Sequence, residues 1–103
     1  MIEVEHWDET RDGPLSEGAL KEKLEERGYS VSRYTYPPGT TFPDHAHGVE
    51  KVDAVLSGRF RITMGGEKVV LEAGDTVLVP QGTVQSAEVV GEKPVVSLDA
   101  VKM

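Results

Sequence analysis

The chain has 103 residues, of which 38% are hydrophobic and 28% charged, and its formal net charge is −7. This length suits one globular domain, and the composition is too apolar for a disordered chain. The acidic balance argues against binding to nucleic acids or anionic membranes, and the sequence contains no apolar run of roughly 20 residues, no recognisable signal peptide and no cysteine.

The N-terminal part is expected to form a strand or arm followed by one short helix. Residues 1–7 alternate apolar and polar side chains, which favours an edge strand or an arm that crosses to a partner subunit. Ser16 can cap a helix over residues 16–27, and a glycine follows where such a helix would end. Leu20 and Leu24 lie one turn apart, so they supply an apolar stripe that must pack on the rest of the domain.

Beyond residue 28 the pattern changes to strands. Alternation with a period of two and closely spaced glycine turns are typical of an all-β sandwich or barrel. The pair Gly65-Gly66 stands between two alternating runs and favours a two-residue hairpin. The predicted strands cover residues 29–36, 52–56, 59–64, 68–72, 76–80, 83–90 and 94–101.

Two glycine-framed segments sharpen this expectation. Within residues 39–58 the first glycine is followed by the pair of histidines His45 and His47, then by Lys51 and a closing glycine. Within residues 74–85 a glycine is followed by Pro-Gln-Gly and then by Gln85. In order and spacing they resemble the two signature motifs of the cupin superfamily. The resemblance implies an antiparallel, jelly-roll-like cupin β-barrel, here with one short N-terminal helix.

The resemblance also implies a metal site with four ligands, namely two histidines, a glutamate and a last histidine. Residues i and i+2 of a strand face the same way, so His45 and His47 can bring their imidazoles together inside a barrel. At the glutamate position, however, the chain has Lys51, whose ammonium group repels a cation. At the last histidine position it has Gln85, whose amide oxygen is a poorer ligand for transition metals. The candidate ligands for Zn, Mn, Fe or Ni are therefore His45, His47 and Gln85, an incomplete set, and no organic cofactor is expected.

Neighbouring carboxylates leave two arrangements of the pocket open. A bulge at Gly48 would turn Glu50 inward in place of Lys51 and supply the missing carboxylate. Without a bulge, Asp53 shares the inward parity of Lys51, and the two side chains can form an ion pair. In that arrangement Lys51, Asp53 and Gln85 line a ligand pocket beside the histidines.

Several functions are compatible with such a pocket. A small-molecule binding protein without a metal would favour an anionic ligand, because Lys51 adds a local positive charge to an acidic chain. The resemblance alternatively implies a metal-dependent enzyme of the dioxygenase, isomerase or decarboxylase type. A structural domain with a vestigial pocket is the third possibility, since fold alone does not decide function. The sequence identifies no catalytic residue.

The organisation of the whole chain follows from these patterns. We expect a single domain over residues 1–103, with the strand or arm and the helix in 1–28 and the β-barrel in 29–103. A chain this short buries a small fraction of its surface alone, which favours a homodimer. The acidic composition, without cysteine or a recognisable signal peptide, favours a cytoplasmic location.

Overall fold

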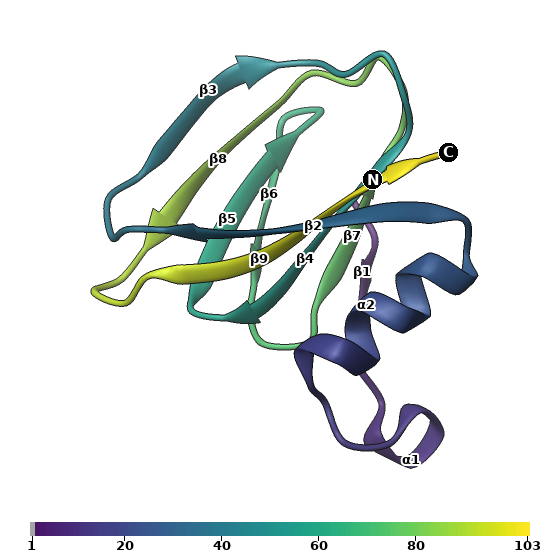
Figure 1. The fold of residues 1–103 in the computed structure, drawn as a ribbon. Coiled ribbons are helices and arrows are strands. Elements are labelled where there is room, and N and C mark those ends of the chain that lie inside the picture. Colours follow the sequence, from purple (N-terminus) through teal and green to yellow (C-terminus); the bar gives the residue numbers. More distant parts are fainter. Residues whose placement is uncertain (1) are drawn as a thin grey trace.

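The computed structural model describes residues 2–103 and consists mainly of two antiparallel β-sheets that enclose a common core (Figure 1). One sheet has the strand order β1-β7-β4-β9-β2, and the other has the order β3-β8-β5-β6. This arrangement confirms the predicted all-β, jelly-roll-like fold. The strands are β1 (Val4–Glu5), β2 (Tyr29–Tyr36), β3 (Thr41–His45), β4 (Lys51–Ser57), β5 (Arg59–Met64), β6 (Glu67–Leu71), β7 (Thr76–Val79), β8 (Gln85–Val90) and β9 (Val95–Lys102).

Alternating side chains place the main core between the sheets. In β5 the residues Phe60, Ile62 and Met64 are buried, as their alternation with polar residues predicts. They meet Val55 from β4 and Val79 from β7 in one cluster, so both sheets contribute to the same core. The hairpin between β5 and β6 turns at two glycines with positive φ, which also matches the sequence pattern.

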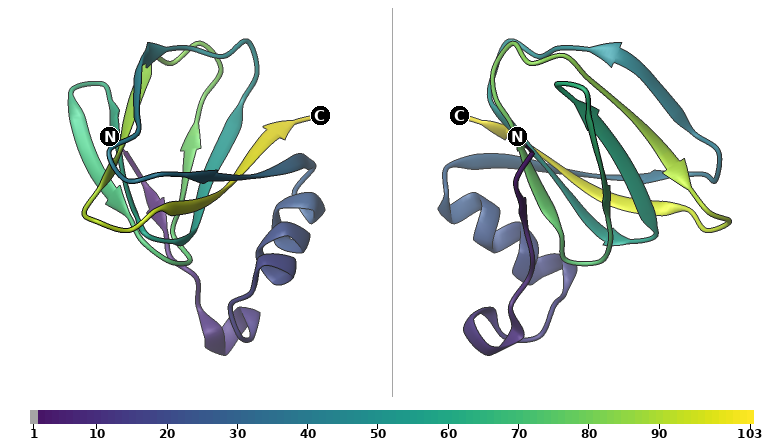
Figure 2. Two further views of the ribbon diagram at one scale, coloured as in Figure 1. Left: turned by 60° about the vertical axis from the view of Figure 1, so that its left-hand side comes forward. Right: turned by 180° about the vertical axis from the view of Figure 1, so that it is seen from behind.

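A second apolar cluster lies on the other face of the five-stranded sheet. Helix α2 (Glu17–Glu26) lies over this face (Figure 2). It buries Leu20 and Leu24 against residues of β2, β4 and β9. The Ser16 side chain accepts a hydrogen bond from the Ala19 N–H, as expected for a helix cap. No helix in residues 2–103 is long and apolar enough to cross a membrane.

Three elements near the N-terminus and the first motif differ from the expectation. A second helix, the single turn α1 (Glu9–Asp12), precedes α2, because the Asp8 carboxylate accepts hydrogen bonds from two N–H groups of that turn. Of the strand predicted over residues 1–7, the structure contains only β1, which pairs with β7. Residue 1 of that prediction lies outside the described part of the chain. Strand β3 was not among the strands predicted from alternation, because its sequence TFPDH is short, mostly polar and interrupted by proline. Only the spacing of His45 and His47 indicated a strand there.

The strand register brings two acidic residues face to face. Strand β4 lies between β7 and β9, and Asp53 of β4 is directly opposite Asp99 of β9.

Gly58 closes the turn between β4 and β5 with a φ of +83°, and an added Cβ there would lie 2.3 Å from the Pro94 carbonyl oxygen. Only glycine therefore allows β4 to turn so close to the start of β9.

Candidate functional site

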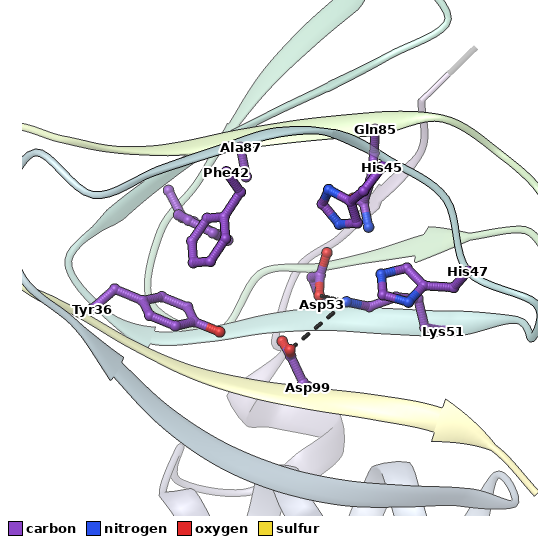
Figure 3. A pocket seen from close by; sticks show the side chains of 10 residues that line it. Tyr36, Phe42, His45, His47, Lys51, Asp53, Gln85, Ala87 and Asp99 are labelled. Atoms are coloured by element: carbon purple, nitrogen blue, oxygen red, sulfur yellow. Dashed lines mark ion pairs between the residues drawn. The ribbon is translucent and has the colours of Figure 1, made fainter.

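A cavity of about 180 Å³ lies between the two sheets and has one aromatic and one polar side (Figure 3). Strands of the five-stranded sheet provide Tyr36, Lys51, Asp53 and Asp99, whereas Phe42, His45, Phe60, Gln85 and Ala87 come from the four-stranded sheet and His47 from the β3–β4 loop. The cavity therefore combines an apolar surface with hydrogen-bonding and charged groups. Such a combination is typical of sites for small molecules.

The two motif histidines lie side by side at this cavity. Their ring centroids are 4.9 Å apart and the rings are perpendicular. His45 ends β3, and its Nδ1 lies 2.8 Å from the Pro43 carbonyl oxygen, to which it donates a hydrogen bond. The sequence suggested that both histidines lie on one strand. In the structure β3 ends at His45, so His47 lies in the loop that follows. Its position in the loop is instead stabilised by the Gly82 N–H, which donates to the His47 carbonyl oxygen at 2.9 Å.

His47 has an unmet hydrogen-bonding group and a lowered pKa, which favours its neutral form. Burial lowers its pKa below the ordinary value, and the positive charge of Lys51 acts in the same direction. Its buried Nε2 has no hydrogen-bond partner among residues 2–103. Buried polar atoms of this kind are rare in folded proteins and need a partner from outside the chain, such as water or a ligand.

Lys51 is the cation of the cavity. Its side chain is only 7% exposed and its Nζ lies 3.0 Å from Asp53 Oδ1 and 3.7 Å from Asp99 Oδ2 (Figure 3). The structure thus contains the Lys51–Asp53 ion pair that the sequence offered as one of two arrangements. Opposed carboxylates on neighbouring strands repel each other, so the lysine also stabilises the pairing of Asp53 with Asp99.

Asp99 was not recognised from the sequence as a pocket residue. Its burial raises the pKa of its carboxyl group to about 6, and the negative charge of Asp53 adds to this effect. A charged residue within the apolar stretch Val95–Val101 is unusual. This pattern was the one sequence feature that could have indicated Asp99 as a pocket residue. Neither its strand partner nor its depth in the barrel could be read from that stretch alone.

Glu50 does not complete the site, so the arrangement with an inward Glu50 is wrong. Its carboxylate accepts a hydrogen bond from the Tyr29 hydroxyl, and its backbone oxygen accepts one from the Lys102 N–H at 2.8 Å. Glu50 is absent from the residues that line the cavity. The side chain that points inward after the two histidines is therefore Lys51.

Gln85 lies at the start of β8, where the last ligand of the second motif was expected. It is paired in register with His45, and only 2% of the residue is exposed. Its Oε1 is the second buried side-chain atom in the described chain that lacks a hydrogen-bond partner. Gln85 Oε1 and His47 Nε2 are thus two unpartnered polar atoms at one cavity.

An aromatic cluster forms the other side of the cavity. The rings of Tyr36 and Phe42 lie 4.9 Å apart, and both also contact Phe60, at 5.7 Å and 6.1 Å between ring centroids. Tyr36 ends β2 and Phe42 belongs to β3, so the cluster joins the two sheets. These three aromatic residues were not predicted to line the pocket, because alternation indicates the inward face but not the position along the barrel.

Comparison with known proteins agrees with the fold and the motif positions. The cupin domain family (Cupin_2) matches residues 32–101. The chain belongs to the cupin family. This cupin is 39% identical over 67 residues to SCO3923, an uncharacterized protein from Streptomyces coelicolor, a match that covers 65% of this chain and 64% of that protein. The chain thus spans less than two thirds of that relative.

Solved structures share the fold at lower identity. A cupin protein from Bacteroides fragilis superimposes with a TM-score of 0.64 and 29% identity, over 81% of this chain and 72% of that one. The DMSP lyase DddQ from Ruegeria pomeroyi superimposes with a TM-score of 0.66 and 23% identity, over 74% of this chain and 39% of that one. At 23% identity, the similarity to DddQ concerns the fold alone.

The side chains of this cupin do not fit the four-ligand metal set that the motifs imply. The glutamate is replaced by a lysine whose ammonium group lies inside the cavity. Within residues 2–103, no three His, Cys, Asp or Glu side chains are grouped so that they could hold a metal ion. His45, His47 and Gln85 therefore remain together at the cavity without the carboxylate that would complete the set.

Proposed function

We propose that this cupin binds a small, uncharged molecule with an apolar body and a polar end that includes a hydrogen-bond donor. The observation that carries the proposal is the pair of buried, unpartnered atoms, Gln85 Oε1 and His47 Nε2, at the cavity. The amide oxygen of Gln85 can only accept a hydrogen bond, so its partner must be a donor. The aromatic cluster on the other side supports an apolar ligand body.

The charges of the cavity favour a neutral ligand over the anion suggested by the sequence. Lys51 is within 4 Å of two carboxylates, Asp53 and Asp99, so its positive charge is already compensated. The lowered pKa of His47 favours its uncharged form. An anion would meet two carboxylates and a cation would meet Lys51, and either would lose its hydration on entry. An anionic ligand held by Lys51 is the competing version that the experiment distinguishes.

The volume limits the size of the ligand. A cavity of about 180 Å³ lies below the 300–1,000 Å³ common for drug-sized ligands. An apolar cavity of about 150 Å³ in another protein accommodates benzene. The cavity of this cupin is therefore suited to a single ring with one small polar substituent, or to an aliphatic molecule of similar size.

Benzamide is a suitable first probe, because it combines a ring, an N–H donor and a carbonyl acceptor without net charge. We expect saturable shifts of cavity residues in ¹H–¹⁵N NMR titrations with benzamide, and weaker binding of benzoate and toluene. Gln85→Met should weaken benzamide binding about tenfold, since about 1.4 kcal/mol is a typical value for one lost hydrogen bond. Gln81→Met is the control, because Gln81 is an exposed glutamine outside the cavity.

Each outcome of this titration bears on the proposal. Absence of cavity shifts with benzamide would contradict it, as would equal binding by the Gln85→Met variant. Tighter binding of benzoate that is lost in Lys51→Met would replace the neutral ligand by the anionic one. All titrations contain a chelator, so that a trace metal cannot provide the binding.

A further inference from the structure

Lys51 lies at the position where the first motif implies a glutamate ligand for a metal. Three residues separate it from His47 and six from Gly58, so it occupies the glutamate position by count. Its side chain enters the cavity from β4, beside the rings of His45 and His47 (Figure 3). Buried lysines are uncommon and almost always paired, and this one is paired with Asp53.

We propose that the ammonium group of Lys51 takes the place of the metal ion in this cupin, so that the pocket carries its own fixed cation and functions without a divalent metal. The inference goes beyond the proposed ligand and does not depend on it. Asp53 and Asp99, at 3.0 Å and 3.7 Å from Lys51 Nζ, stabilise the charged form of the lysine. They also hold the ammonium group inside the cavity, at the place where the motif would put a metal-ligating carboxylate.

The two unpartnered atoms follow from the same replacement. His47 Nε2 would be one donor toward a metal, and Gln85 Oε1 stands at the position of another, yet neither has a hydrogen-bond partner in the described chain. An ammonium group carries three N–H donors, and of its two ion-pair partners only Asp53, at 3.0 Å, is within hydrogen-bond distance of Nζ. A remaining N–H of Lys51 can therefore bind a carbonyl or hydroxyl oxygen of a ligand, which gives the lysine the electrostatic role that a metal would have.

The test is a gain of metal binding. Lys51→Glu removes the internal cation and restores a carboxylate next to His45 and His47. After incubation with Zn²⁺ or Co²⁺ and gel filtration, elemental analysis should find about one metal ion per chain in this variant and none above background in the wild-type protein. Co²⁺ bound to the Lys51→Glu variant should also give visible absorption bands. These bands should be absent from the double variant that carries both Lys51→Glu and His47→Ala. Lys68→Glu is the matched control, because Lys68 is exposed on β6 and lies outside the cavity.

Two results would overturn the inference. One is a wild-type protein that retains about one metal ion per chain and loses it in His45→Ala. The other is a folded Lys51→Glu variant, verified by circular dichroism, that binds no more metal than Lys68→Glu. If three neighbouring carboxylates prevent Lys51→Glu from folding, Lys51→Gln replaces it. This variant removes the cation without adding a carboxylate, so the expected gain over the wild-type protein is smaller. Failure of benzamide to bind would contradict the proposed ligand but not this inference, whose readout is the metal.

Discussion

The carboxyl group of Asp99 should make the protein less stable as the pH rises. Burial raises its pKa from 3.8 to about 6, so the folded protein binds this proton more tightly than the unfolded chain does. The contribution of Asp99 to the free energy of unfolding therefore falls between about pH 4 and about pH 6. The difference between these two pKa values corresponds to about 3 kcal/mol.

Asp99→Asn should remove this loss, because asparagine resembles the neutral carboxyl group and has no proton to release. Urea unfolding at several pH values between 4 and 7 would give the free energy of unfolding of both proteins. The variant should gain about 3 kcal/mol relative to the wild-type protein across this range. Asp44→Asn, at an exposed position of β3, is the control and should show no such trend. An Asp99→Asn difference that stays constant from pH 4 to pH 7 would refute the reasoning.

Four further substitutions test the fold. Gly58→Ala should destabilise the protein by about 2 kcal/mol or more in urea unfolding, because its φ is positive and its Cβ would lie 2.3 Å from a backbone oxygen. Gly91→Ala has a similar φ but open space around the Cβ, so it should cost about half as much. Leu24→Ala should cost about 2–5 kcal/mol by leaving a cavity beneath α2, and a smaller loss would mean that the helix is loosely packed. Hydrogen bonding to Arg27 lowers the pKa of Glu5 to about 2. Glu5→Gln should therefore destabilise the protein at pH 7. This destabilisation should fade as the pH falls from about 4.5 towards 2.

Much of the barrel could be predicted because alternation and glycine turns are local signals. Phe60, Ile62 and Met64 alternate with polar residues, and the structure buries all three. The helix that packs through Leu20 and Leu24 was predicted for the same reason, since its apolar residues recur with the helical period. These elements depend on side chains close together in the sequence, and so they need no knowledge of strand order.

The pocket was predicted less completely because it depends on which strands are neighbours. His45, Lys51 and Gln85 could be found from the spacing of the motifs. Asp99 and Tyr36 could not, since they reach the cavity only because β9 pairs with both β4 and β2. Parity indicates that a residue faces inward, whereas strand order and register decide which inward residues meet.

The loop position of His47 makes the two motif histidines unequal in their response to change elsewhere in the chain. His45 belongs to β3 and is paired with β8, so the sheet itself sets its direction. His47 depends on the hydrogen bond from Gly82, which belongs to the turn before β8. A longer or differently shaped turn at residues 80–83 would therefore move one imidazole and leave the other in place. The geometry of the pocket in this cupin thus depends on a turn whose own side chains stay outside the cavity.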